Sequence, residues 1–151
     1  MTRLSVWMTA VLVLPSLAAA DSLGTMAMQY GGTTEMMEII PGIPGENSSW
    51  VPLGDLFIFS IVAVQPDGTR LVMSATAIPG GFEGISLQID EPGHDRWFGD
   101  TDTGVSLTGL RLQRQGNVLL VEGPISGRVE TGMGQPGQIT GRIDAALPMR
   151  Q

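Results

Sequence analysis

The sequence predicts an all-β protein: a single antiparallel β-sandwich or barrel-like domain of about eight or nine strands. Two observations support this prediction. The 151 residues include 21 glycines and 10 prolines, and all of these except Pro15 follow residue 20. Turn formers and helix breakers at this density disfavour a mostly helical chain. The apolar segments are short and are separated by turn sequences, as in strands joined by short connections.

The first twenty residues, Met1–Ala20, have the pattern of a secretory signal peptide. Arg3 supplies a positive charge, Leu4–Leu17 is apolar, and three alanines precede Asp21. An uncleaved membrane anchor is the alternative, but the apolar run is shorter than the roughly 20 residues that span hydrocarbon. We therefore expect cleavage, one domain at residues 21–151, no membrane span after cleavage, and a periplasmic or secreted location.

The composition excludes several classes of function. Fifteen acidic side chains outnumber eight basic ones, for a formal net charge of −7. Nucleic-acid and anionic-membrane binders need clustered positive charge, so both are disfavoured. The chain has no cysteine, which excludes disulfides, thiolate metal sites and a cysteine nucleophile.

The clearest predicted strand is Leu56–Val64, which is rich in aromatic and β-branched residues and lacks alternation. This pattern favours a strand covered on both faces, with Phe57 and Phe59 in the core. The turn Gln65–Thr69 contains Pro-Asp-Gly, and it predicts that Arg70–Ile78 folds back antiparallel on the first strand.

The remaining elements follow from the same reasoning. Pro-Gly breaks make Pro41–Ser49 a loop. In one further strand, Ile85, Leu87 and Ile89 share the buried face. These further strands are predicted at Thr25–Tyr30, Thr33–Ile40, Phe82–Ile89, Val105–Leu112 and Val118–Glu122.

A short internal similarity marks the C-terminal part of the chain. Ile125–Glu130 recurs as Ile139–Asp144, each with the order apolar, hydroxyl, Gly, Arg, apolar, acidic. A glycine inside a strand indicates a bulge, a bend or the close approach of another backbone. We expect the Arg and acidic side chains on the solvent face and the Ile and Val side chains inside.

The candidate binding residues lie in the densest polar stretch and in one glycine-rich loop. Residues 90–102 combine acidic side chains with the only histidine and two aromatic residues. Met133 lies in the second loop, where packing does not explain it. The candidates for binding are His94, Asp95, Trp97, Phe98 and Met133.

Two metal sites are possible, and each has a simpler alternative. Asp100 and Asp102 before Gly104 resemble the start of a calcium loop, but the same residues are typical of a hydrogen-bonded turn. Met26 and Met28 would share one strand face and could bind Cu(I), whereas methionine more often fills gaps in a core. We favour the simpler alternatives and expect no cofactor.

No catalytic constellation is evident in the sequence. A Ser-His-Asp triad cannot be assembled from sequence neighbours of His94, and no Gly-x-Ser-x-Gly elbow occurs. The sequence therefore predicts a non-enzymatic exported binding, adaptor or accessory module that contacts a protein partner through a sheet edge or loops. The alternatives are a metal carrier or a small hydrolase, which would need two carboxylates in one cleft with His94 or Trp97.

Overall fold

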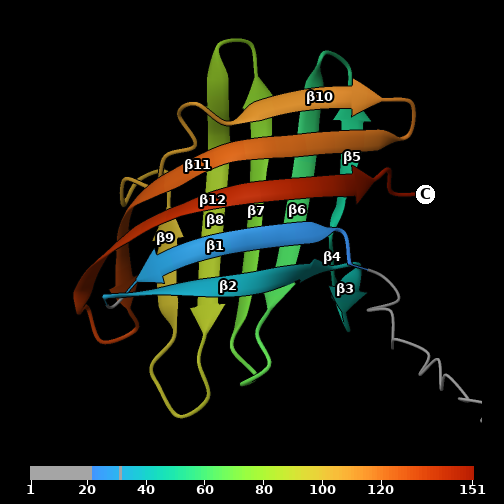
Figure 1. Ribbon diagram of the computed structural model, residues 1–151. Coiled ribbons are helices and arrows are strands. Elements are labelled where there is room, and N and C mark those ends of the chain that lie inside the picture. The colour runs from blue at the N-terminus through green and yellow to red at the C-terminus, as the bar shows by residue number, and fades with distance from the viewer. Residues whose placement is uncertain (1–21, 31) are drawn as a thin grey trace, which may run out of the picture.

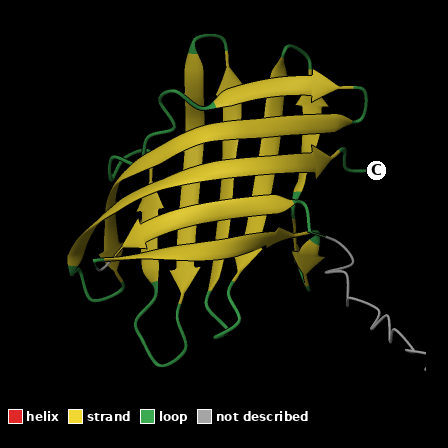
Figure 2. Ribbon diagram, in the orientation of Figure 1, coloured by secondary structure: helices red, strands yellow, loops and turns green. Residues whose placement is uncertain are grey.

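The structure is a computed structural model that describes residues 22–30 and 32–151. The predicted signal peptide lies outside these residues. The described residues form strands, turns and loops without a helix (Figure 2), so the all-β prediction is confirmed. A helix that is long and apolar enough to cross a membrane is accordingly not found in this part of the chain. The strands are β1 (Gly24–Tyr30), β2 (Thr33–Ile40), β3 (Gly42–Ile43), β4 (Glu46–Asn47), β5 (Ser49–Leu53), β6 (Leu56–Val64), β7 (Arg70–Ile78), β8 (Gly81–Asp90), β9 (Trp97–Asp100), β10 (Arg111–Gln115), β11 (Val118–Thr131) and β12 (Pro136–Pro148).

Ten of the described strands form one antiparallel sheet that closes on itself. Along the sheet the order is β10-β11-β12-β1-β2-β6-β7-β8-β9, with β5 beside β6. β9 also pairs with β11 through Thr131 and Glu130, which completes the ring. Figure 1 shows the result as two layers: β10, β11, β12, β1 and β2 cross in front of β5 to β9. Closure leaves two strands, β5 and β10, at the ends of the sheet.

The β6–β7 hairpin forms where the sequence predicts it. Its turn is closed by the Thr69 amide, which donates to Asp67 Oδ1 at 2.8 Å. Gly68 takes a φ of 94°, a value that glycine adopts without steric cost. The strands then pair in register from Val64 with Arg70 to Phe57 with Ala77.

The core fills the space between the two layers. Ile85, Leu87 and Ile89 are buried, as their alternation predicts. Phe59 is buried too, whereas Phe57 is only partly buried and packs against the core at its margin. Met26 and Met28, considered above as copper ligands, are enclosed in the core together with Met37 and Met73, where packing accounts for them.

The two similar segments of the C-terminal part lie on neighbouring strands and pair with each other. Ser126 of β11 faces Thr140 of β12 in a long antiparallel register. The apolar residues of both segments, Ile125, Val129, Ile139 and Ile143, are buried. Their Arg and acidic residues are exposed, as predicted.

Five features of the observed strands differ from the sequence predictions. β5 was not anticipated, and the predicted loop Pro41–Ser49 contains the small β3–β4 hairpin. β9 forms inside the polar stretch, and Val105–Leu110 is not a strand. Leu56–Val64 is not covered on both faces throughout, because Ile58 points outward and is 39% exposed. The local pattern records neither which distant strands pair nor which face of a strand the rest of the protein covers.

Candidate binding site

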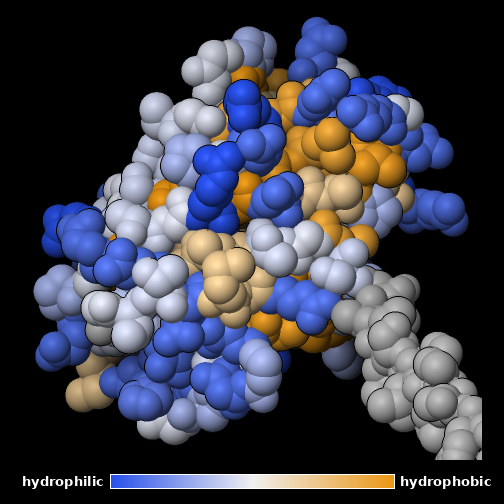
Figure 3. Space-filling view, in the orientation of Figure 1, coloured by the Kyte–Doolittle hydropathy of each residue, from blue (hydrophilic) through white to orange (hydrophobic). Residues whose placement is uncertain are grey.

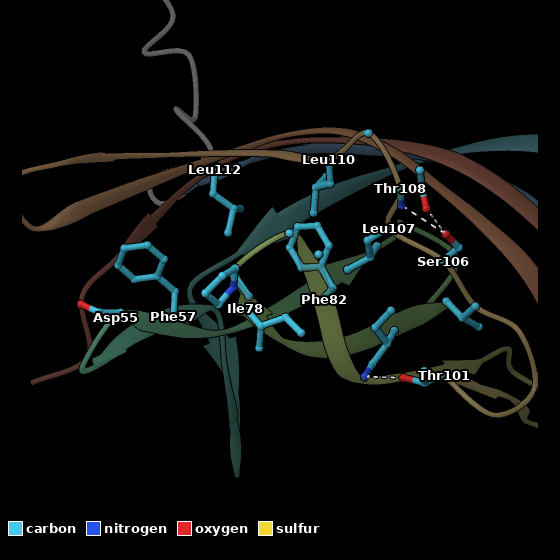
Figure 4. A pocket seen from close by; sticks show the side chains of 17 residues that line it. Asp55, Phe57, Ile78, Phe82, Thr101, Ser106, Leu107, Thr108, Leu110 and Leu112 are labelled. Atoms are coloured by element: carbon cyan, nitrogen blue, oxygen red, sulfur yellow. Dashed lines mark hydrogen bonds between the residues drawn. The ribbon is translucent and has the colours of Figure 1, made fainter.

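A pocket lies between the two layers, at the end of the sheet where the β5–β6 and β7–β8 hairpins turn. We call it the apolar pocket (Figure 4). Its volume is about 650 Å³. Its side chains come from both layers and from the connection between β9 and β10. The lining residues are Asp55, Phe57, Ala77, Ile78, Pro79, Gly80, Gly81, Phe82, Ile85, Thr101, Val105, Ser106, Leu107, Thr108, Gly109, Leu110 and Leu112.

One wall of the apolar pocket is the β7–β8 hairpin. Pro79 and Gly80 make its turn, which places Ile78 and Phe82 on either side of it. The Phe82 ring meets the buried Phe59 ring edge-on, with centroids 6.3 Å apart, an arrangement that aromatic rings favour. Phe82 itself is only partly buried, so part of its ring surface is available inside the pocket.

The opposite wall is the segment 104–110, which lies against β11. Gly127 and Gly123 of β11 permit this close approach. A Cβ atom on Gly123 would lie 2.8 Å from the Gly109 oxygen, and one on Gly127 would overlap the Gly104 oxygen. Ser106 and Ser126 exchange two backbone hydrogen bonds of 2.7 and 3.0 Å. The strand glycines therefore hold the wall in place, as the sequence suggested for glycines inside strands.

The polar groups of the apolar pocket already have partners within the protein. The Thr101 hydroxyl accepts a hydrogen bond from the Ile85 amide at 3.0 Å. The hydroxyls of Ser106 and Thr108 lie 2.8 Å apart and form a hydrogen bond. Asp55 is the one titratable side chain among the described lining residues, and it is exposed at the rim. The surface that the pocket offers without breaking these hydrogen bonds is therefore mainly apolar.

Three of the five predicted binding residues meet in a second pocket, which we call the acidic pocket. It lies beyond the other end of β8 and has a volume of about 440 Å³. His94, Asp95 and Trp97 line it, whereas Phe98 and Met133 do not. Phe98 points outward and is 43% exposed, and Met133 is 79% exposed on its loop. The remaining lining residues are Tyr30, Thr33, Glu35, Glu91, Thr131 and Gln135.

The acidic pocket is negatively charged because the nearby arginines pair with a carboxylate outside it. Arg96 and Arg70 both pair with Asp90, the latter at 3.0 Å, and neither lines the pocket. Burial raises the pKa of Asp90, but hydrogen bonds from Gln88 and the two arginines lower it by more. Three carboxylates, from Glu35, Glu91 and Asp95, therefore line the pocket without an arginine.

Trp97 and Tyr30 form the aromatic part of the acidic pocket. Trp97 packs over Gly137, where an added Cβ atom would lie 2.7 Å from the indole Cζ3. Burial raises the pKa of Tyr30, and so do the charge of Glu91 and a hydrogen bond to it. The phenol therefore stays protonated beside the carboxylates.

The predicted calcium ligands form a hydrogen-bonded turn. The Thr103 amide donates to Asp100 Oδ1 at 2.7 Å, and the Asp100 amide donates to the Thr103 hydroxyl at 2.8 Å. Asp102 is exposed on the same turn. Within residues 22–30 and 32–151, no three His, Cys, Asp or Glu side chains are placed to hold a metal ion.

Sequence reasoning did not identify the residues of the apolar pocket. Phe57, Leu107, Leu110 and Leu112 have the same side-chain types as the core, so composition does not distinguish them. The available signal was position: Phe57, Ile78 and Phe82 all lie close to glycine or proline residues that form turns, where the two layers end. The chain matches no family model, no curated protein and no solved structure.

Proposed function

We propose that the chain is a non-enzymatic binding protein, exported after removal of residues 1–20, and that the apolar pocket is its binding site. The observation that carries the proposal is the open pocket of about 650 Å³ between the layers, lined mainly by apolar side chains. Ligand pockets typically measure about 300–1,000 Å³ and are mainly apolar with a few polar groups. The mouth of a closed sheet is a common position for them.

The chemistry of the lining favours an apolar group as the ligand. Phe57, Phe82 and Leu112 are only partly buried by the protein, so an apolar group in the pocket would remove their remaining surface from water. Burial of apolar surface contributes about 25 cal/mol per Å². The hydroxyls at the rim can orient a polar end of the ligand once they exchange partners.

The same lining favours binding over chemistry. General acid–base catalysis needs titratable groups that reach the reacting atoms. Asp55 is exposed, and the described lining has no second titratable group to act with it.

Titration with N-phenylnaphthylamine, a neutral apolar fluorophore, tests the proposal. We expect saturable binding that Leu112→Gln weakens about tenfold, because the substitution puts an amide into an apolar site. Gly81→Leu is the second variant expected to weaken binding, because it adds a side chain to a lining residue. A Cβ atom at Gly81 would have no other atom within 4 Å, so the protein has room for the substitution. Gly132→Leu is its matched control, a glycine with equally open surroundings that does not line the pocket. Unsaturable binding, or equal binding by all variants, would contradict the proposal.

A carboxylate-based hydrolase is the second candidate. The observation that favours it is the acidic pocket, where Glu35, Glu91 and Asp95 share a cleft with His94 and Trp97. Glycosidases use two carboxylates across the scissile bond. Turnover of a chromogenic glycoside that is lost in Glu91→Gln would support this candidate, and absence of turnover across a glycoside panel would count against it.

A further inference from the structure

The two strands at the ends of the sheet differ in whether their outer edge is available. β5 pairs only with β6, and β10 only with β11, among the described strands. An unpaired edge exposes backbone N–H and C=O groups that can accept another strand. Proteins generally protect such edges, so an unprotected one points to a partner.

The outer edge of β5 is protected. Pro52 has no amide hydrogen to donate. The Trp50 carbonyl already accepts a hydrogen bond from the Arg150 amide at 2.9 Å, and Trp50 forms a bridge with Met149. Residues near the C-terminus thus occupy the position that an added strand would take.

The outer edge of β10 carries arginines, but it lacks the two protections of β5, a proline and a segment in the position of an added strand. Its five residues, Arg111–Gln115, include no proline. Within the described residues, the backbone of β10 hydrogen bonds to β11 and to no other segment. Figure 3 shows apolar residues gathered over the ends of β10 and its neighbours near the C-terminus, beside this edge.

The apolar pocket lies directly behind the edge of β10. Leu112 is the β10 residue that lines it. Figure 1 shows the turns of the β5–β6 and β7–β8 hairpins extending past β10, so the front layer ends before it covers them. A strand added to β10 would lie over these hairpins. Since successive side chains of a strand point to opposite faces, alternate side chains of that strand would enter the pocket.

The charge of β10 indicates the chemistry of the added strand. The strand carries Arg111 and Arg114 and no acidic residue. Glu122 is shared, at 3.1 Å from Arg111 and 2.7 Å from Arg142, so one carboxylate faces two guanidinium groups. Arg114 lies over the Trp50 ring at 5.2 Å and donates to the Gly116 carbonyl. In a chain with a net charge of −7, this edge is a local site of positive charge.

We infer that an extended segment of a partner protein, with alternating apolar and acidic side chains, adds to the outer edge of β10 and places its apolar side chains in the apolar pocket. This inference rests on the proposed function and specifies its ligand. Backbone hydrogen bonds to β10 provide part of the affinity, and the pocket provides the selectivity for apolar side chains. The acidic side chains face Arg111 on the outer surface, which favours this segment over a basic one.

The probe for this inference is an acetylated and amidated peptide of alternating glutamate and valine. We expect it to bind the protein and to displace N-phenylnaphthylamine, whereas the corresponding lysine–valine peptide should not. Two N-methylated versions of the peptide, one methylated at every glutamate amide and one at every valine amide, should differ in affinity. Only one of these two sets of N–H groups faces β10 in a paired strand. Equal effects of the two N-methylation patterns would overturn the inference.

Two protein variants complete the test. Arg111→Glu should weaken binding of the acidic peptide about tenfold or more. Arg128→Glu is the matched control. Arg128 is an exposed arginine on β11 that does not belong to the edge strand, so this variant should bind the peptide like the unchanged protein.

If the fluorophore binds but the peptide neither binds nor displaces it, the inference is wrong while the proposed function stands. If the fluorophore does not bind either, the proposed function itself fails. Sedimentation that shows a dimer dissociated by Arg111→Glu would assign the edge to a second copy and would also overturn the inference.

Discussion

The two pockets lie beyond opposite ends of β8 and differ in the source of their residues. The apolar pocket adjoins the hairpin before β8 and is lined by side chains of the type that fill the core. The acidic pocket adjoins the loop after β8 and is lined by polar side chains from three loops and strand ends. The apolar pocket is a part of the core that the front layer does not cover. The acidic pocket forms where three loops between strands come together. This closed sheet therefore has two pockets with chemically distinct linings.

The largest expected effect is a loss of stability when the contact between segment 104–110 and β11, which forms one wall of the apolar pocket, is disrupted. Gly127→Val places a side chain where the Gly104 and Val105 backbone lies, and we expect a loss of roughly 3 kcal/mol in the free energy of unfolding. Urea denaturation measures it. Gly132→Val is the control, since no atom lies within 4 Å of that position, and it should cost about 1 kcal/mol or less. Equal losses of stability in both variants would show that the position of segment 104–110 does not depend on its close approach to Gly127.

A smaller effect is expected at the acidic pocket. Trp97→Ala removes a partly buried ring packed over Gly137, and it should lower the free energy of unfolding by about 2 kcal/mol. Binding of N-phenylnaphthylamine should be unchanged, because Trp97 does not line the apolar pocket. Phe98→Ala, at the exposed neighbour in β9, should cost less than Trp97→Ala. Loss of fluorophore binding in Trp97→Ala would mean that the two pockets are coupled.

The smallest effect concerns pH. The pKa of Tyr30 is raised above its ordinary value of 10, so the folded protein keeps the phenol protonated at a pH where the unfolded chain loses the proton. Stability is therefore unaffected by this group below pH 10 and falls as the pH rises above it. Tyr30→Phe should reduce this alkaline loss. Because Tyr30 is the only tyrosine, ultraviolet absorbance of the phenolate reports its titration, and Glu91→Gln should move that titration toward lower pH. A titration at the pH of free tyrosine would contradict the assignment.

The sequence predicted those parts of the fold that depend on local patterns. The turn at Gln65–Thr69 and the alternation before Asp90 are encoded within a few residues, and both appear as expected. β5 was missed because Pro52 and the preceding loop weaken its pattern, while its pairing with β6 is a tertiary contact. Val105–Leu110 has apolar alternation but lies across β11, since Gly123 and Gly127 allow it to approach.

The candidate sites were predictable to different degrees for the same reason. His94, Asp95 and Trp97 are close in sequence, so one polar stretch identified them together. Tyr30 and Glu35 reach the same pocket from β1 and β2, which only the closure of the sheet brings near. The apolar pocket was not predictable, because its residues differ from core residues in their position at the end of the layers and not in their type.

The most direct test of this account is a comparison of backbone amide chemical shifts with and without N-phenylnaphthylamine. We predict changes at Gly80, Thr108, Gly109 and Leu112, around the apolar pocket, and none at His94, Trp97 or Gln135. Changes concentrated at the acidic pocket, or spread evenly over the sheet, would contradict the claim that the open space between the layers is the binding site.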